Sequence, residues 1–466
     1  MAERFSNATF RDSSPAWANA CVGDNGKPDI VDYAEGFANA ARVLLEQVLE
    51  HRGLKYPADT FVYPICFNMR HAIELYIKAA IETLRALNHH VYRLPQFDTD
   101  TSHNIGNLWA YFKEHALAID RRYQSLVAAL DRDILDFSEV DATGQVFRYP
   151  FSRENQKHLT ELAIISLRVL AEKFPKLVEN LKTLNYQGGV LAHEYRFKTY
   201  TSRLSRFDLI CIAYRVPPRS EWGSVAFGRA KAELKAHFGI GSKEFSLAIS
   251  HIESNIEMAA IIDQPRLFLH LNPMQLNSFF DAWCQFNDLD EMKRHYSEPV
   301  RDIAARVSAK ELGENFDIVA ELYADAKSRQ DTWPRLVQEI TPEAFGEIDA
   351  LIRFTRDKLE YSEEFERERN ITIRDFLAAA ARGEDEFRQS AFHLLKKRMA
   401  LVHVLNTLRF FGHIDMVHAV ITKLGLREYA GQFLENSSHC VSRRYQKAAD
   451  ALGVGLRHPA NERLPD

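Results

Sequence analysis

Residues 60–88 read TFVYPICFNMRHAIELYIKAAIETLRALN, and this stretch decides the fold class. Its largely apolar side chains recur at steps of three and four, which is the period of an α-helix. They fall into two stripes, the first at Ile65, Met69, Ala72, Tyr76, Ala79, Thr83 and Leu87, and the second at Ile73, Ile77, Ile81 and Leu84. A helix that is apolar on two sides packs on two sides. We therefore expect a central helix in an all-α domain.

The rest of the chain continues this helical pattern. It has only 20 glycines and 16 prolines among 466 residues. Together they make up about 8% of the chain, against a typical value of roughly 12%. Folds rich in β-strands need many turns that contain glycine or proline. Residues 207–214 fit either a strand or a short buried helix. A short helix is expected after the polar residues 101–104, and longer ones at 32–51, 60–88, 121–137, 155–184, 228–238, 243–262, 273–287, 297–308, 315–327, 342–359, 371–380, 384–411, 413–423 and 427–435.

Clusters of turn-forming residues divide the chain. Gln187-Gly188-Gly189 is the strongest candidate for a domain boundary. We expect a flexible N-terminal arm at 1–30, a helical bundle at 31–186, a helical domain of unknown type at 190–455 and a polar tail at 456–466.

Composition limits the expected partners and location. The net charge is −5, so a general electrostatic attraction to nucleic acid or to a membrane surface is not expected. The five cysteines lie far apart with no CxxC pair, which favours reduced thiols over disulfides or a zinc site. No apolar stretch approaches a membrane span, and the first residues lack the apolar core of a signal peptide. We expect a cytoplasmic protein with no membrane partner, no metal and no other cofactor.

Parts of the first domain resemble the HEPN superfamily of bacterial toxins, abortive-infection proteins and defence ribonucleases. They are residues 70–79 (RHAIELYIKA), the His-led helix start at 103–108 (HNIGNL) and the turn at 137–150. The resemblance covers about residues 33–185. It implies a bundle of four or five helices and RNA cleavage, often by a homodimer. It implies nothing about residues 190–466.

Nucleases of that superfamily carry an arginine followed, after four to six residues, by a histidine. The histidine moves a proton at the ribose 2′-hydroxyl or the leaving oxygen, and the arginine stabilises charge on the phosphate. Arg153 and His158 are our candidates, because we expect the last bundle helix to begin there and a helix N-terminus favours phosphate. Glu154 counts against catalysis because an acid repels phosphate. The alternative is a solvated arginine and a half-buried histidine.

The arginine–histidine spacing alone has little weight, because the same separation occurs at Arg85/His90, Arg388/His393 and Arg398/His403. The first of these pairs straddles a helix end, where a capping interaction is expected. The other two lie within an expected helix, where five residues place side chains on diverging faces. We interpret them as solvated helix faces.

The polar residues Arg70, His71 and Glu74 have two interpretations. Charged residues four apart on a helix pair with one another, which gives these side chains a structural role. Alternatively, the three line the bundle cleft beside His158 and assist binding. We interpret His103 as a helix cap or packing residue.

Three functions are compatible with these patterns. The first is an antiviral-defence or toxin-type protein, which as an enzyme is a metal-independent endoribonuclease acting on RNA, with Arg153 binding phosphate and His158 as general acid/base in a homodimer. The second is a non-catalytic scaffold whose C-terminal helical region recruits a protein or nucleic-acid partner. The third is a DNA-binding regulator.

The third function comes from residues 234–252, which loosely match a helix-turn-helix with Gly239-Ile240-Gly241 as the turn. Lys235 departs from the pattern, since that position usually needs alanine, and no second basic element is nearby. The alternative interpretation is a plain helical hairpin. Metal chemistry has weaker support, because His413 and His418 are five apart and do not share a helix face.

Overall fold

The computed structural model describes residues 7–88, 93–152, 154–297, 318–429 and 445. Within these ranges every regular element is a helix, apart from one isolated bridge between Phe151 and Lys157. The all-α prediction is therefore confirmed. The chain divides into two compact units, Met1–Lys198 and Thr199–Asp466, which we call unit 1 and unit 2.

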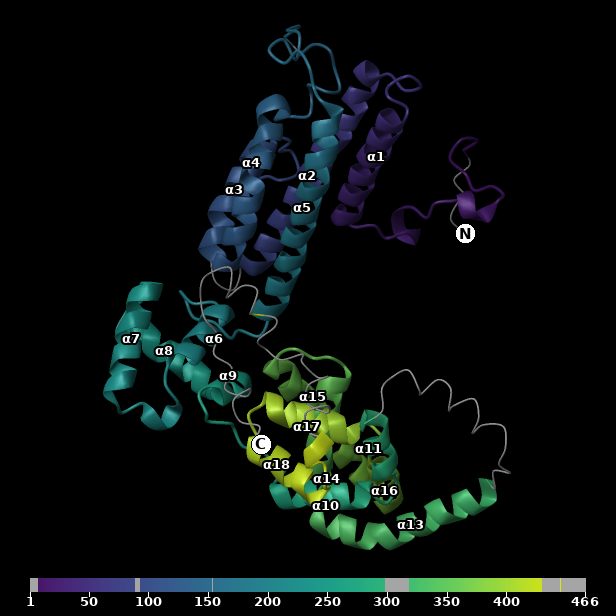
Figure 1. The fold of residues 1–466 in the computed structure, drawn as a ribbon, viewed down its shortest axis with the longest axis vertical. Helices are drawn as coiled ribbons and strands as arrows, with labels where there is room; N and C mark the ends of the chain where they lie inside the picture. Colours follow the sequence, from purple (N-terminus) through teal and green to yellow (C-terminus); the bar gives the residue numbers. More distant parts are fainter. Residues whose placement is uncertain (1–6, 89–92, 153, 298–317, 430–444, 446–466) are drawn as a thin grey trace. The chain divides into compact units, whose positions relative to one another are not determined.

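Unit 1 is a bundle of five long helices (Figure 1). They are α1 (Ile30–Glu50), α2 (Ala58–Asn88), α3 (Ile105–Ile119), α4 (Gln124–Asp141) and α5 (Leu167–Tyr195). Helix α2 packs against each of the other four, and both of its predicted apolar stripes are largely buried. The prediction that this helix is central is confirmed, because its two apolar faces are both covered.

The last helix of the bundle begins later than the predicted residue 155. It starts at Leu167, after Ser166, whose side chain accepts a hydrogen bond from the backbone of Val169. Residues 155–166 form no helix, and Asn155 and Leu159 adopt positive φ angles of 59° and 56°, which break a right-handed helix. His158 is therefore not at a helix N-terminus.

The predicted boundary at Gln187-Gly188-Gly189 is also wrong. Both glycines lie within α5, and the two units divide after Lys198. Gly188 is buried where α5 packs on α2. The two helices are so close there that a Cβ on residue 188 would come within 2.9 Å of the Thr83 side chain. This glycine permits close helix packing and does not mark a turn.

A buried ion-pair cluster holds the far end of α5. Arg122 Nη2 lies 2.7 Å from Asp120 and 2.6 Å from Glu194, and all three side chains are almost fully buried. Burial alone would lower the pKa of Arg122, but the two carboxylates raise that pKa well above its usual value. The cluster fixes the start of α4 against the end of α5.

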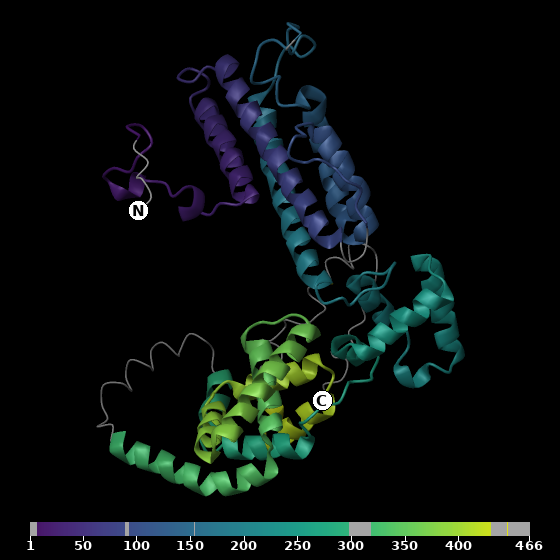
Figure 2. The same ribbon diagram turned by 180° about the vertical axis from the view of Figure 1, so that it is seen from behind.

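Figure 2 shows the helices of unit 2 from behind, and their buried apolar residues form two hydrophobic clusters. The first surrounds α6–α9, and the second surrounds the remaining helices. The helices are α6 (Arg206–Arg215), α7 (Val225–Phe238), α8 (Ser242–Ser254), α9 (Ile256–Ile261), α10 (Pro273–Trp283), α11 (Leu289–Ser297), α13 (Ile318–Glu339), α14 (Pro342–Arg356), α15 (Ser362–Arg382), α16 (Glu384–Leu395), α17 (Ala400–Phe410) and α18 (Ile414–Lys423).

Several predicted boundaries in unit 2 need correction. The ambiguous residues 207–214 are helical, within α6. The predicted helix 243–262 is divided at Asn255, whose side chain caps α9. The predicted helix 384–411 is divided between α16 and α17. The predicted helix 297–308 and most of 427–435 lie outside the described residues, as does the predicted tail 456–466.

Buried polar contacts join the two clusters of unit 2. Arg206 Nη2 lies 2.6 Å from Glu257 Oε2 and 3.0 Å from Glu363 Oε2. The amide of Asn255 and the hydroxyl of Thr199 both donate hydrogen bonds to Glu363 Oε1. Helices α6, α9 and α15 therefore share one network of compensated charge.

The described part of the predicted arm, residues 7–29, is exposed throughout and contains only two short 3-10 turns. A search of the described helices finds none with both the length and the apolar character needed to span a bilayer.

Candidate functional site: a two-histidine cavity in the bundle

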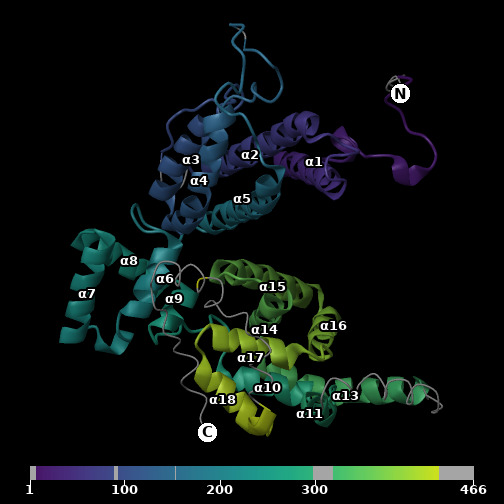
Figure 3. The ribbon, with the colours of Figure 1, turned by 45° about the horizontal axis from the view of Figure 1, so that its top comes forward.

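A polar cavity of about 520 Å³ lies in unit 1, between the segment that precedes α3 and the segment that follows α4. Figure 3 shows these helices side by side, with the α4–α5 connection extending beyond one end of the bundle. The side chains in its wall that could take part in catalysis are those of Ser102, His103, Ser152, Glu154 and His158. Two histidines from segments about fifty residues apart in sequence thus contribute to one cavity.

Local hydrogen bonds bring the two segments together. Asn104 caps α3 by accepting from the backbone of Asn107, and the Ile105 amide donates to the Ala142 carbonyl at 2.9 Å. Asp141 Oδ1 accepts from the amides of Gly144 and Gln145, at 2.8 and 3.0 Å. These bonds fold the chain sharply after α4 and hold that turn against the start of α3.

Arg70 forms hydrogen bonds to both sides of this junction between the start of α3 and the turn after α4. It is 2% exposed and donates to the carbonyls of Asp141 and Ala142 at 3.2 and 2.7 Å, and to the carbonyl of His103. Gly144, at φ +77°, lies against the guanidinium, where a Cβ would approach Nη1 to 3.1 Å. Arg70 is not among the cavity-lining residues, so its contacts favour the structural interpretation.

Glu74 is the buried anion of the junction. Its side chain, 3% exposed, pairs with Arg70 and lies 3.0 Å from Lys78 Nζ and 2.9 Å from His103 Nδ1. Burial alone would raise its pKa, but the nearby His71, the hydrogen bonds from His103 and Lys78, and the charge of Arg70 lower it far below the usual value. Glu74 is therefore ionised at neutral pH and can only accept hydrogen bonds.

His103 combines a fixed orientation with access to the cavity. Its Nδ1 faces the ionised Glu74, and an acceptor there requires Nδ1 to carry a proton. In the neutral ring Nε2 then carries the lone pair. The side chain is 63% exposed and lines the cavity. A carboxylate that fixes the tautomer of a histidine is the arrangement that prepares it for proton transfer.

His71 does not share this role. Its ring packs between Phe37 and Phe67, with centroid separations of 4.4 and 5.7 Å. It lies 3.8 Å from Glu74 and does not line the cavity. We assign it to the packing of α1 on α2.

His158 lies in the wall of the cavity, as a member of the irregular segment after Pro150. Its backbone amide donates to the Pro150 carbonyl at 3.0 Å, and the Ser152 hydroxyl accepts from the amides of Glu154 and Gln156. Its Nε2 is buried without a hydrogen-bond partner among the described residues. Arg153, the predicted partner of His158, lies outside the described residues.

The other arginine–histidine pairs are held in separate contacts. Arg85 pairs with Glu82 and donates to the Phe97 carbonyl, whereas His90 lies outside the described residues. Arg388 pairs with Asp385, and Arg398 lies 3.2 Å from Glu291.

Helices α7 and α8 form the helical hairpin that the sequence suggested. Gly239 ends α7 at φ +62°, the left-handed conformation that favours glycine. Leu234, Ile240 and Phe245 are all buried in one cluster. Lys235 Nζ reaches the Ser242 hydroxyl at 2.8 Å across the turn.

Neither possible metal ligands nor similarity to known proteins indicates a further function. No group of three or more His, Cys, Asp and Glu side chains in the described ranges is placed to hold a metal ion. The chain matches no protein-family model, no curated protein and no solved structure.

The sequence did not predict the contact of His103 with Glu74 or the place of His103 in the cavity wall. Its position directly before a capping asparagine suggested a local role, whereas its decisive partner, Glu74, is 29 residues away. The available signal was a histidine directly before a helix-capping asparagine, in a bundle whose central helix carries charged residues four positions apart.

Proposed function

We propose that unit 1 is a metal-independent endoribonuclease of the bacterial defence or toxin type, acting in the cytoplasm. The observation that supports this proposal is that His103, oriented by Glu74, shares a polar cavity with His158. Two histidines provide both a general base and a general acid, which is what RNA transesterification without a metal requires. The resemblance to the HEPN superfamily supports RNA as the substrate.

In the proposed reaction His103 is the base. Its Nε2 removes the proton from a ribose 2′-hydroxyl, and the 2′-oxygen attacks the adjacent phosphorus. The bond from phosphorus to the 5′-oxygen breaks, and protonated His158 gives its proton to that oxygen. The products are a 2′,3′-cyclic phosphate and a free 5′-hydroxyl. Arg153 is assigned to the phosphate on sequence grounds, because it precedes His158 at the spacing that HEPN nucleases use, whereas Glu154 in the cavity wall counts against phosphate binding. A homodimer would supply a second set of these residues.

The test compares cleavage of a 5′-labelled single-stranded RNA by the wild type and by His103→Ala, His158→Ala and His237→Ala. His237 is an exposed histidine of unit 2 and serves as the matched control. We expect each cavity variant to lose at least about 100-fold in rate, the contribution of one acid–base group, and the control to retain activity. Equal rates in all four folded proteins, or no cleavage by the wild type, would overturn the proposal. RNA binding without cleavage would favour the scaffold function.

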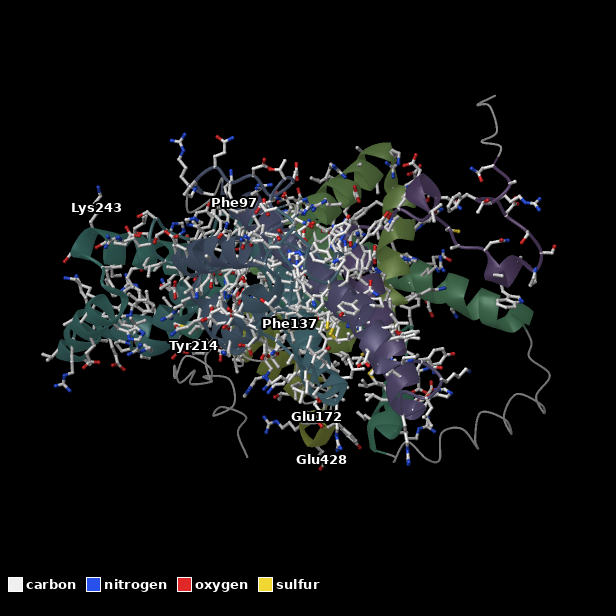
Figure 4. The ribbon with its side chains drawn as sticks, turned by 90° about the horizontal axis from the view of Figure 1, so that it is seen from above. Phe97, Phe137, Glu172, Tyr214, Lys243 and Glu428 are labelled. Carbon is white, nitrogen blue, oxygen red and sulfur yellow. The ribbon has the colours of Figure 1, made fainter. Side chains whose placement is uncertain are left out.

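DNA binding through α7 and α8 is a second candidate, with which the hairpin, its left-handed glycine and its shared apolar core are compatible, although a plain helical hairpin has the same features. Lys243 lies in the first turn of α8, and its side chain points away from the helix (Figure 4). If α8 binds duplex DNA, the affinity is expected to weaken steeply with salt. Fluorescence anisotropy with wild type and Lys243→Glu tests it, and absence of binding at low salt would exclude it.

A further inference from the structure

Unit 2 contains a second cavity, of about 570 Å³, that is independent of the proposed ribonuclease site. It lies between α14, α15 and α16, and Lys397 closes it from the connection that follows α16. This volume is within the range of small-molecule sites. Three cationic side chains line it: Arg353 and Arg356 on α14, and Lys397.

One buried carboxylate positions two of these cations. Asp349, 6% exposed, accepts from Arg353 Nε at 2.9 Å through Oδ2 and from Lys397 Nζ at 2.8 Å through Oδ1. Asp349 and Arg353 are four apart on α14, so both face the cavity. A single carboxylate therefore holds two cations of the wall in fixed positions, and both of its oxygens are occupied.

The cations keep donors beyond those that Asp349 occupies. Arg353 Nη1 lies 3.6 Å from Glu368 Oε2, which is beyond direct hydrogen-bond distance. Arg356 directs Nε and Nη2 to Asp357, at 2.7 and 2.8 Å, and these contacts leave its Nη1 uncommitted. A lysine ammonium carries three donors, of which Lys397 directs one to Asp349.

Gln389 and His393 of α16 add further donors to the wall, whereas the Ser390 hydroxyl of the same helix donates to the Glu386 carbonyl at 3.0 Å. The other acid in the wall, Asp375, is 53% exposed and lies 3.3 Å from Arg374. Glu368 and Asp357 are the remaining acids near the cations, and each faces an arginine. The wall thus offers more N–H donors than acceptors, with Phe376 and Leu394 as its apolar part.

The geometry points to a binding site for the phosphoryl group of a small organic phosphate. Arginine forks match the oxygens of a phosphate, and a lysine adds a point charge. A phosphoryl group fills only part of about 570 Å³, so the remainder accommodates the organic moiety beside the apolar side chains. Inorganic phosphate shares the same recognition chemistry.

Isothermal titration calorimetry on the full chain tests the site with inorganic phosphate, ribose 5-phosphate and adenosine monophosphate, and with sodium chloride for ionic strength. We expect saturable 1:1 binding of at least one phosphate compound. Tighter binding of an organic phosphate identifies the organic moiety as part of the ligand, and equal or tighter binding of inorganic phosphate identifies the free ion. Absence of saturable binding by all three compounds would overturn the proposal.

Two variants locate the binding. Arg356 and His393 are exposed side chains, so Arg356→Gln and His393→Gln should leave the Asp349 contacts intact. Each variant is expected to weaken binding at least tenfold. Arg335→Gln is the control that keeps wild-type affinity, because Arg335 is an exposed residue of the same unit that pairs with Glu339, outside the cavity wall. Unchanged affinity in both cavity variants, with fold confirmed by circular dichroism, would overturn the assignment.

Discussion

His103 Nδ1 lies 2.9 Å from Oε1 of Glu74, a carboxylate that is 3% exposed and belongs to the central helix of unit 1. The orientation of an exposed histidine is therefore set by a buried charge on another element. The same carboxylate compensates Arg70 and Lys78. The stability of the bundle and the orientation of His103 consequently depend on one side chain.

Replacing Glu74 with glutamine should destabilise unit 1 strongly. The change leaves the buried Arg70 without its anion, and loss of one partner of a buried pair costs about 3–5 kcal/mol. Urea unfolding followed by circular dichroism measures the loss. Glu82→Gln is the control on the same helix, because Glu82 is 52% exposed and its ion pair is worth at most about 1 kcal/mol. Equal losses in the two variants would contradict this account.

The two glycines of α5 should respond oppositely to alanine. At Gly189 a Cβ meets nothing within 4 Å, so Gly189→Ala should stabilise by about 0.5–1 kcal/mol through helix propensity. At Gly188 a Cβ would lie 2.9 Å from Thr83 Cγ2, so Gly188→Ala should destabilise by about 1 kcal/mol or more through overpacking. Differential scanning calorimetry compares the two melting temperatures, and a rise in both would contradict the packing described.

Unit 2 should lose stability in mild acid through His413. This residue is 7% exposed, its ring stacks on Phe268 at 4.3 Å, and burial lowers its pKa. Its lowered pKa means that the unfolded chain binds the proton first as pH falls. The unfolding free energy should therefore decrease below about pH 6.5, by at most about 1.4 kcal/mol per pH unit from this group.

Melting temperatures at pH 7.5, 6.5 and 5.5 measure this dependence in the wild type and in His413→Gln. Glutamine carries no titrating group, so the variant should show a shallower decrease. Identical pH profiles would show that His413 contributes nothing to the acid sensitivity.

Arg206→Met should unfold unit 2 more readily than Arg219→Met. Arg206 is 1% exposed between Glu257 and Glu363, and its loss leaves the buried carboxylate of Glu257 and the partly buried one of Glu363 without their cation, at a cost of about 3–5 kcal/mol. Arg219 is 43% exposed and pairs with Glu253, so its ion pair is worth at most about 1 kcal/mol. Urea titrations that rank the variants in the reverse order would refute this role for Arg206.

The central helix was predictable because its two apolar stripes are continuous and local. The start of α5 was not, since Leu159 and Leu162 continue a helical spacing through residues that form no helix. The real start depends on Ser166 and on backbone conformations that periodicity does not encode. The break between α16 and α17 was missed for a related reason, because neither glycine nor proline marks it.

The candidate site was predictable only in part. The sequence singled out His158 and Glu74, but it paired His158 with Arg153, which lies outside the described residues. The contact of Glu74 with His103 joins residues on two elements, and the contacts of Arg70 with Asp141 and Ala142 span about seventy positions. Such contacts are fixed by tertiary packing, which residue spacing does not report.

The network around Glu363 has a consequence for how unit 2 can be dissected. A fragment that begins after α9 would keep Glu363 on α15 but lose the guanidinium of Arg206 and the amide of Asn255 that satisfy it. A fragment that ends after α9 would keep Arg206 and Glu257 but lose Glu363, the second anion that pairs with Arg206. Neither half would be an autonomous folding piece, so the backbone amides of α6 and α15 should exchange with deuterium in a single cooperative opening.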